Sequence, residues 1–247
     1  MSSLGIIGGT GALELFEAGI AASATTPWGD SSAAPVEVDL GLTRAWFLAR
    51  HGRPHRIPPH RINYRANIAA LRALGVAHLV ALNAVGGIDR ELAAGALVLP
   101  DQLIDYTWGR VHTFSDDVDA ALEHIEFARP FAGPTRQALL DAAAQAGVYV
   151  HDGGCYGVTQ GPRLETAAEV MRMAADGCSL VGMTAMPEAA LAREAGLDYA
   201  SLCVIANPAA RVGDQPISVA EIHHVLERAM LQVAALLRHL PPMAGST

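Results

Sequence analysis

Short apolar runs alternate with amphipathic segments along most of this 247-residue chain. Apolar runs bounded by turn residues are typical of buried strands, and apolar residues recurring every three or four positions are typical of helices that cover a sheet. The alternation therefore predicts an α/β fold in which a largely buried sheet is flanked by helices. The expected strands span residues 4–7, 36–40, 45–48, 78–83, 97–104, 148–159, 180–183 and 199–206. The expected helices span residues 63–74, 133–146, 166–176, 187–195 and 219–239.

Nothing in the chain resembles a linker or an internal repeat, and its length suits one large domain. We therefore expect a single domain over residues 1–247, with an ordered core of about residues 3–240 and a tail, residues 241–247, that frays. The Ser/Ala/Gly-rich stretch 21–35 is interpreted as a surface loop. Because neither a signal peptide nor an 18-residue apolar run is present, a soluble cytoplasmic protein is expected.

The charge and the residue types exclude several classes of function. A net charge of -8 argues against nucleic acid as a partner, because neutralising a phosphate backbone requires a basic surface. All 17 basic residues are arginine, which excludes the lysine-dependent Walker loop and Schiff-base catalysis. The 3 cysteines form no CxxC pair, so neither a zinc knuckle nor a disulfide framework is predicted.

Arginines and histidines are concentrated in residues 48–65, whose sequence is LARHGRPHRIPPHRINYR. Such a density in an acidic protein predicts an anion pocket in which Arg50 grips a phosphate bidentately. For Arg53, Arg56 and Arg61, a solvated basic loop is the favoured interpretation. Its histidines are separated by prolines and accompanied by no Cys, Asp or Glu, so no metal site is expected.

Two glycine-containing turns follow expected strands. Gly8–Gly11 includes Thr10, and backbone N–H groups and a hydroxyl at that position could bind an anion, although a plain tight turn is an equally good interpretation. Leu13 stands where a dinucleotide fingerprint requires its third glycine. Asn83 and Ala84 begin the second turn, NAVGG, at the end of a strand, where ligands of open α/β sheets collect.

Three further segments combine polar residues with strand ends, and each has an ordinary structural explanation. Glu165 precedes an expected helix, where an acid is also favoured by the helix dipole. Thr184 could contact phosphate, and Met183 could pack on a sugar, although an isolated methionine is more often part of a core. Asn207 closes the last strand, where a turn residue is also common.

Taken in order, the segments GGTG, RHG, PPHRINYRANI, NAVGGI, GPRLET, GMTAMPEAALARE and YASLCVIAN resemble the family of trimeric purine nucleoside phosphorylases and methylthioadenosine phosphorylases. The resemblance extends from about Gly5 to Asn207. It implies a phosphorylase/hydrolase-like fold with a central mixed sheet, pentosyltransferase activity and a homotrimer. It also implies no cofactor and no metal, with inorganic phosphate as the co-substrate of a small-molecule nucleoside.

The resemblance also assigns roles to individual residues. Phosphate would be bound by Thr10, Arg50, His51, Asn83, Ala84 and Thr184. The nucleoside would be bound by Met183, Leu164, Glu165, Asn207, Val219, Ile222, His223 and, from a neighbouring subunit, His124. The catalytic residues would be Asn207, Glu165 and His51. The family usually has Thr or Ser where this chain has Asn83, so that contact is expected to be altered.

The pair Glu165 and Asn207 predicts the base. Hypoxanthine offers an N1–H donor to a carboxylate and an O6 acceptor to an amide, whereas adenine offers the opposite pattern and would leave buried groups unpaired. The adenine-specific branch of the family carries Ser and Asp at these two positions. We therefore expect an inosine-type substrate. At its 5' end, Val219 and Ile222 would suit a methylthio group and His223 a hydroxyl, and the overall likeness to the family favours phosphorolysis of S-methyl-5'-thioinosine. The alternatives are a general inosine/guanosine phosphorylase, a methylthioadenosine phosphorylase, a nucleoside hydrolase or a non-catalytic nucleoside-binding protein.

Overall fold

The computed structural model describes residues 3–16, 19–23, 25–116, 124–210 and 219–244, and ten strands of these ranges form one mixed sheet. The strands are β1 (Leu4–Gly8), β4 (Val36–Asp39), β5 (Arg44–Ala49), β6 (His78–Gly87), β7 (Leu97–Leu99), β8 (Gln102–Asp105), β9 (Val150–Asp152), β10 (Cys155–Val158), β11 (Leu180–Gly182) and β12 (Asp198–Pro208). Their order is β4-β5-β1-β6-β11-β10-β8, and β12 pairs with both β6 and β7.

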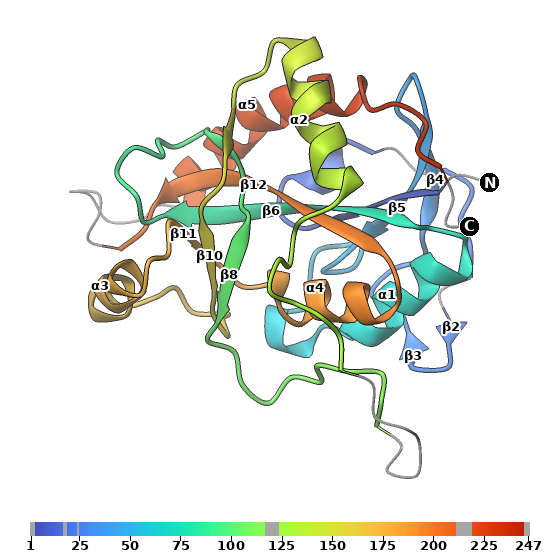
Figure 1. Cartoon of the computed structure of the whole chain (residues 1–247), viewed down its shortest axis with the longest axis horizontal. Coiled ribbons are helices and arrows are strands. Elements are labelled where there is room, and N and C mark those ends of the chain that lie inside the picture. Colours follow the sequence, from blue (N-terminus) through green and yellow to red (C-terminus); the bar gives the residue numbers. More distant parts are fainter. Residues whose placement is uncertain (1–2, 17–18, 24, 117–123, 211–218, 245–247) are drawn as a thin grey trace.

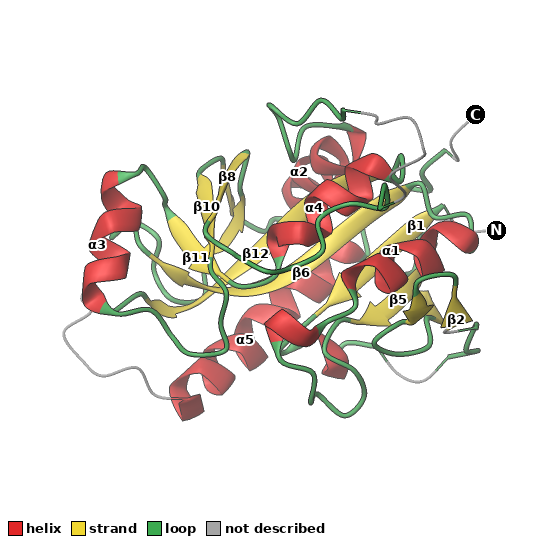
Figure 2. Ribbon diagram, turned by 90° about the horizontal axis from the view of Figure 1, so that it is seen from below, coloured by secondary structure: helices red, strands yellow, loops and turns green. Residues whose placement is uncertain are grey.

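Helices cover both faces of this sheet, as Figures 1 and 2 show. They are α1 (Tyr64–Ala73), α2 (Pro134–Ala146), α3 (Ala167–Ala175), α4 (Ala185–Glu194) and α5 (Val219–Leu237). Successive strand residues point to opposite faces. Ile6 and Val80 therefore join the apolar cluster under α2 and α5, whereas Ile7 and Leu79 join the cluster under α1 and α4. All four are fully buried, and the expected α/β architecture is confirmed.

Turn residues explain most differences from the expected strands. The predicted strand 97–104 is divided at Pro100, which has no N–H for a ladder hydrogen bond, into β7 and β8. The predicted strand 148–159 is divided at Gly153 and Gly154, whose φ angles are 111° and 107°. The predicted loop 21–35 contains a small hairpin, β2 (Thr25–Thr26) and β3 (Gly29–Asp30).

The two ends of the described chain lie together. Ser3 donates from Oγ to the carbonyl oxygen of Met243 at 2.5 Å, and His78 Nε2 lies 2.8 Å from the carbonyl oxygen of Ala244. Backbone oxygens of residues 243 and 244, within the tail expected to fray, are thus hydrogen-bonded to Ser3 and to His78 of β6. Every helix in the described ranges is too short or too polar to cross a membrane.

Strand direction determines where polar residues gather. The strands β5, β1, β6 and β12 are mutually parallel, so their carboxyl ends lie at one edge. In contrast, β11 runs antiparallel to β6, with Leu180 opposite Gly87. The chain leaving β11 therefore runs back along β6, which brings Thr184 to Asn83. Because β10 is parallel to β11, the segment after β10 arrives at the same place.

Candidate active site

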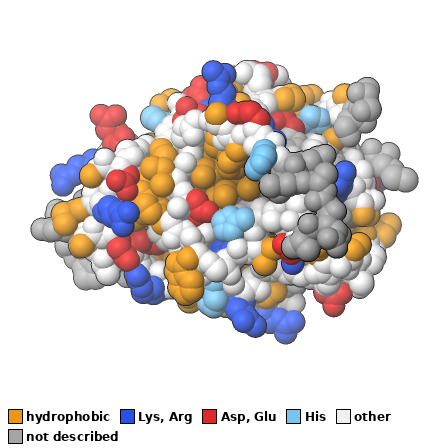
Figure 3. Space-filling model, turned by 60° about the horizontal axis from the view of Figure 1, so that its bottom comes forward, with side chains coloured by type: hydrophobic (Ala, Val, Ile, Leu, Met, Phe, Trp, Pro, Cys, Tyr) orange, Lys and Arg blue, Asp and Glu red, His pale blue; other side chains and the backbone are white. Residues whose placement is uncertain are grey.

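A cavity of about 430 Å³ lies at this meeting point. The expected site residues that line it are Thr10, Arg50, His51, Asn83, Ala84, Leu164, Glu165, Met183, Thr184, Asn207 and Ile222. They come from segments more than 200 residues apart along the chain, and sheet topology alone brings them together. Apolar side chains and histidines gather in the middle of the face shown in Figure 3.

Three expected site residues are not placed in this cavity. His223 is exposed and lines an adjoining cavity of about 460 Å³, which shares Thr10 and His55 with the first. His124 is exposed and lines neither cavity. The side chain of Val219 lies outside the described residues. Among the described side chains at the predicted start of the last helix, Ile222 lines the main cavity.

Arg50 is buried directly after β5 and is held by protein acceptors. Its Nε and Nη2 donate to the two carboxylate oxygens of Glu188 at 2.7 and 2.9 Å, and further N–H groups donate to the carbonyl oxygens of Leu82 and Ile7. Burial alone would lower the pKa of Arg50, but the charge and hydrogen bonds of Glu188 raise it above its ordinary value. The expected bidentate grip on phosphate is therefore wrong, because the guanidinium fork binds Glu188. Four N–H groups of the Arg50 guanidinium thus donate to protein oxygens, and one N–H on Nη1 remains available for a ligand.

His51 lies beside Arg50 as a neutral ring. Its Nδ1 is 2.7 Å from the carbonyl oxygen of Ile57, which can only accept, so Nδ1 carries the proton. Burial and the neighbouring Arg50 charge lower the pKa of His51 to about 4. Nε2 therefore has a lone pair at neutral pH. A Cβ at Gly9 would lie 3.4 Å from this nitrogen and 3.2 Å from Arg50 Nη1, so glycine allows the backbone to approach both groups.

Asn83 connects the phosphate end of the cavity to the core. The hydroxyl of Thr184 donates to Asn83 Oδ1 at 3.0 Å, and Asn83 Nδ2 donates to Ser201 Oγ at 2.7 Å. All three side chains are buried. The longer Asn side chain, at a position where Thr or Ser was expected, is thus accommodated by Ser201 of β12. Its amide orients Thr184, which lines the same cavity.

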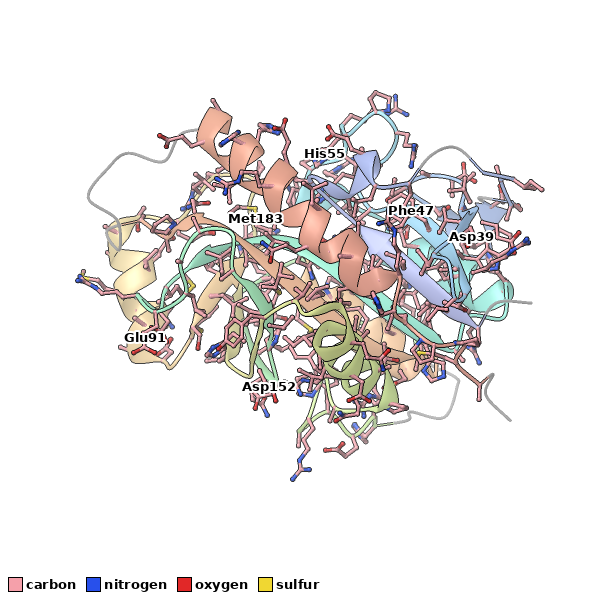
Figure 4. The ribbon with its side chains drawn as sticks, turned by 90° about the horizontal axis from the view of Figure 1, so that it is seen from above. Asp39, Phe47, His55, Glu91, Asp152 and Met183 are labelled. Atoms are coloured by element: carbon pink, nitrogen blue, oxygen red, sulfur yellow. The ribbon has the colours of Figure 1, made fainter. Side chains whose placement is uncertain are left out.

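An apolar surface lies between the polar ends of the cavity. Met183 follows β11 and lines the cavity together with Ile222 of α5. Figure 4 shows Met183 and His55 beside the ribbon of α5. Gly161 packs against Met183, because a Cβ at Gly161 would lie 2.5 Å from Met183 Sδ, and the φ of Gly161 is 58°. Glycine at 161 is therefore required both for space and for backbone conformation.

Glu165 is oriented toward the cavity by Thr159, whose hydroxyl donates to Glu165 Oε1 at 2.5 Å. The helix-start interpretation of Glu165 is wrong, because α3 is capped by Thr166 and Glu169 in a capping box. Glu165 precedes that cap and is available for another contact. Its second carboxylate oxygen, Oε2, accepts no hydrogen bond among the described residues.

Asn207 is placed by an irregularity in β12. The register of β12 against β6 shifts between Ile205 and Asn207, and such a bulge changes the direction of the side chains that follow it. Asn207 Nδ2 donates to the carbonyl oxygen of Pro208 at 2.7 Å. One N–H and the Oδ1 of this amide remain for a ligand. Asn207 lines the cavity that Glu165 also lines.

No sequence pattern indicated that Glu188 holds Arg50 in place. Glu188 accepts hydrogen bonds from Arg50 and from the hydroxyl of Tyr199 at 2.9 Å, yet a glutamate near a helix start normally suggests solvent. Glu188 lies in α4, a helix that is buried along most of its length, so its carboxylate faces the protein interior. The burial of α4 is visible only in the fold. No group of three or more His, Cys, Asp or Glu residues suited to a metal ion occurs within the described ranges.

The fold is that of an α/β nucleoside phosphorylase. The chain belongs to the phosphorylase superfamily, whose family model matches residues 3–240. It is 48% identical over 242 residues to the probable S-methyl-5'-thioinosine phosphorylase of Xanthomonas campestris pv. campestris, with 96% of each chain covered. It is 36% identical over 252 residues to the 6-oxopurine nucleoside phosphorylase of Pyrococcus furiosus, covering 98% of this chain and 93% of that one.

A solved structure gives the same result. The methylthioadenosine phosphorylase from Schistosoma mansoni in complex with adenine is 34% identical, and its TM-score against this structure is 0.89. The match covers 97% of this chain and 91% of that chain. The family resemblance identified from the sequence motifs is therefore confirmed over nearly the whole chain.

Proposed function

We propose that this protein catalyses the phosphorolysis of S-methyl-5'-thioinosine, giving hypoxanthine and 5-methylthioribose 1-phosphate in purine salvage. The observation that carries the proposal is the arrangement around one cavity of the carboxylate–amide pair, Glu165 and Asn207, together with buried Arg50. Inorganic phosphate is the co-substrate, and the reaction uses neither a cofactor nor a metal. The names of the relatives from Xanthomonas campestris and Pyrococcus furiosus support a 6-oxopurine substrate.

The two polar side chains at the base end match a 6-oxopurine. Glu165 Oε1 accepts from Thr159, so Oε2 accepts from the N1–H of hypoxanthine. The second N–H of Asn207 donates to O6, and its Oδ1 accepts from N7 when N7 becomes protonated. Adenine would place an N1 lone pair against the carboxylate and an amino group against the amide N–H. Each such unpaired buried group costs about 1–3 kcal/mol.

The phosphate end supplies both donors and an acceptor. The remaining Nη1 N–H of Arg50 and the hydroxyl of Thr10 donate to phosphate oxygens, and the lone pair of His51 Nε2 accepts from a protonated oxygen. As the glycosidic bond lengthens, positive charge develops on the ribosyl carbon, and the anion held beside it stabilises that charge before attacking the carbon. Asn207 stabilises the leaving purine. No covalent bond to the protein forms.

The apolar lining supports a 5'-methylthio group over a 5'-hydroxyl. Ile222 lines the cavity, whereas the neighbouring His223, the residue that would suit a hydroxyl, faces the adjoining cavity. Burial of a thiomethyl group against an apolar side chain is favourable, whereas a hydroxyl in the same place would find no hydrogen-bond partner on that side chain. A general inosine/guanosine phosphorylase is the second candidate, and the name of the Pyrococcus furiosus relative favours it.

A substrate panel tests the proposal. Purine release from methylthioinosine, inosine, guanosine and methylthioadenosine is measured with and without phosphate, on the parent protein and on Glu165→Gln. We expect phosphate-dependent release that is fastest from methylthioinosine and is strongly reduced by the substitution. Equal turnover of methylthioadenosine would contradict the assignment of Glu165 and Asn207 to the recognition of a 6-oxopurine. Release without phosphate would indicate a hydrolase, and nucleoside binding without release would indicate a non-catalytic binding protein.

Assembly and location complete the proposal. We propose a cytoplasmic homotrimer in which His124 of one subunit reaches the sugar end of the next subunit's site. The exposure of His124, outside its own chain's cavity, supports this role. Sedimentation should show three chains, and His124→Ala should raise the KM for nucleoside. Mixing His124→Ala with an inactive Arg50→Ala variant should restore activity in mixed trimers, and no recovery would contradict the shared site. Cell fractionation tests the location.

A further inference from the structure

Arg110 makes six hydrogen bonds from one guanidinium, although it lies outside the arginine-rich segment 48–65. It is half-buried in the loop after β8, and its donor–acceptor distances are between 2.6 and 3.3 Å. The acceptors are the carbonyl oxygens of Thr159, Gln160, Met183 and Met186, the side-chain oxygen of Gln160 and the hydroxyl of Tyr64. Four of these six acceptors are backbone oxygens, so the contacts fix the course of the chain.

The backbone acceptors belong to two separate segments of the cavity wall. One segment leaves β10 and leads to Glu165, and the other leaves β11 and carries Met183 and Thr184. Nη2 of Arg110 donates to the first segment and Nη1 donates to the second. The guanidinium therefore supports the spacing between the part of the cavity assigned to the base and the part assigned to the sugar, in addition to the backbone hydrogen bond from the Thr159 N–H to the carbonyl oxygen of Gly182 at 2.8 Å.

A direct path of contacts leads from Arg110 to the base carboxylate. The carbonyl oxygen of Thr159 accepts from Arg110, while the hydroxyl of the same residue donates to Glu165. On the other side, Met183 accepts through its carbonyl oxygen, and its sulfur packs against Gly161. Displacement of either segment would move a group that faces the nucleoside. Thr184, at the phosphate end, lies on the same segment as Met183, whereas Thr10 and His51 lie on other segments.

The shape of Arg110, more than its charge, explains these contacts. None of the ion pairs found among the described residues involves Arg110. A planar guanidinium presents its donors along two edges and can bridge two chain segments at once. A lysine ammonium is a point donor on a flexible stem and cannot reproduce this geometry. The ring of Tyr64 lies under the guanidinium, 5.6 Å from its carbon, and keeps it in place.

We infer that Arg110 is a positioning residue that holds the Glu165 carboxylate and the sugar-facing Met183 at the spacing a purine nucleoside requires. The inference rests on the proposed function, because the ligand that it positions is the nucleoside. It predicts a larger effect on the nucleoside than on phosphate, because most residues assigned to phosphate lie outside the two segments that Arg110 holds.

The test compares Arg110→Met with Arg61→Met. Arg61 is an exposed arginine that lines the same surface cavity as Arg110, and its side chain makes no hydrogen bond within the described ranges. For Arg110→Met we expect kcat/KM for the nucleoside to fall by about 100-fold, the loss that follows from misplacing reacting groups by roughly 1 Å. The fall should combine a higher KM for nucleoside with a lower kcat, while the KM for phosphate changes by a smaller factor. Arg61→Met should behave as the parent.

Two further variants separate positioning from folding. Arg110→Lys keeps the charge and should remain impaired, and added guanidinium ion should restore nucleoside affinity to Arg110→Ala. The melting temperature and the fraction of active sites are measured for each variant. An unchanged nucleoside KM in both Arg110→Met and Arg110→Lys, or a loss explained wholly by a smaller folded fraction, would overturn the inference. If Arg110→Met does not fold, Arg110→Lys and guanidinium rescue decide the outcome.

Binding of hypoxanthine keeps the test independent of turnover. Calorimetric affinity is measured for the parent and for Arg110→Lys, and the variant should bind the base at least about 10-fold more weakly. If the parent binds hypoxanthine but releases no purine from nucleosides, the proposed function has failed and the positioning role can still be judged. Equal hypoxanthine affinity of the two proteins would overturn the positioning role alone.

Discussion

Replacing Glu188 by Gln removes the carboxylate that pairs with buried Arg50 while changing the side-chain volume very little. Both groups are almost completely shielded from water, with exposed side-chain fractions of 0% for Glu188 and 1% for Arg50. Glutamine keeps one oxygen acceptor, but in either orientation its NH2 group faces an N–H donor of Arg50. The substitution therefore leaves a buried cation without a counter-charge and one donor opposed by another.

The magnitude follows from this burial. Breaking a buried, hydrogen-bonded ion pair by removing one partner costs about 3–5 kcal/mol. In a chain of this size each kcal/mol corresponds to roughly 2–4 °C in Tm, so the variant should melt about 6–20 °C below the parent. Tyr199→Phe removes a single hydrogen bond to Glu188 and leaves the ion pair intact. Its cost should be about 1.5–3 kcal/mol, because only one hydrogen bond to a charged group is lost.

Calorimetric melting with and without phosphate provides the assay. An anion bound beside Arg50 supplies the missing counter-charge, so phosphate should raise the Tm of Glu188→Gln more than it raises the Tm of the parent. Tyr199→Phe should show the parent's response to phosphate. If Glu188→Gln melts within 3 °C of the parent, roughly one kcal/mol, Arg50 does not depend on Glu188 and the reasoning from burial fails.

Three further outcomes are expected. Burial lowers the pKa of His51 to about 4, so on acidification the unfolded chain takes up a proton before the folded chain does. As pH falls from about 6.5 to 4, the parent should lose about 3 kcal/mol of unfolding free energy that His51→Asn does not lose. An equal loss of unfolding free energy in the two proteins, measured by denaturation at each pH, would refute this. Asn207→Asp, which replaces the donor to O6 by an acceptor, should lower kcat/KM for methylthioinosine by about 10-fold or more, and an unchanged substrate preference would contradict the role of the amide. Gly161→Ala should displace Met183 and raise the nucleoside KM, with an added cost of about 1 kcal/mol for the positive φ; wild-type kinetics would show that this contact is unimportant.

Helices and strands were predictable where apolar periodicity was strong, but the residues at which they begin and end were not. The strand after Asp198 and the helix ending at Leu237 follow directly from buried apolar positions. The division at Pro100 depends on a missing backbone donor, which outweighs the apolar run around it. The extension of β6 through two glycines to Gly87 depends on pairing with β11 and β12, partners that no local pattern identifies.

The residues of the cavity were predictable because they lie in motifs at strand ends, whereas the residues that hold them were not. Arg50 and Glu188 are 138 positions apart, and Arg110 and Met183 are 73 positions apart. No spacing rule connects such pairs, because their meeting depends on strand order and direction. The bidentate grip expected of Arg50 failed for this reason. A fork geometry suits a phosphate and a carboxylate equally well, and only the fold shows which of them it meets.

The direction of β11 explains why phosphate and nucleoside effects should separate. Except for Thr184, the groups assigned to phosphate follow or end the parallel strands β1, β5 and β6. Glu165, Met183 and Thr184 follow β10 and β11, which run the other way. The hydrogen bond between Asn83 and Thr184 joins the two halves on one side of the cavity. Arg110 contributes further hydrogen bonds, which join the segments following β10 and β11. A substitution at Asn83 should therefore act first on phosphate, and one at Arg110 first on the nucleoside, although both residues connect the same pair of strand systems.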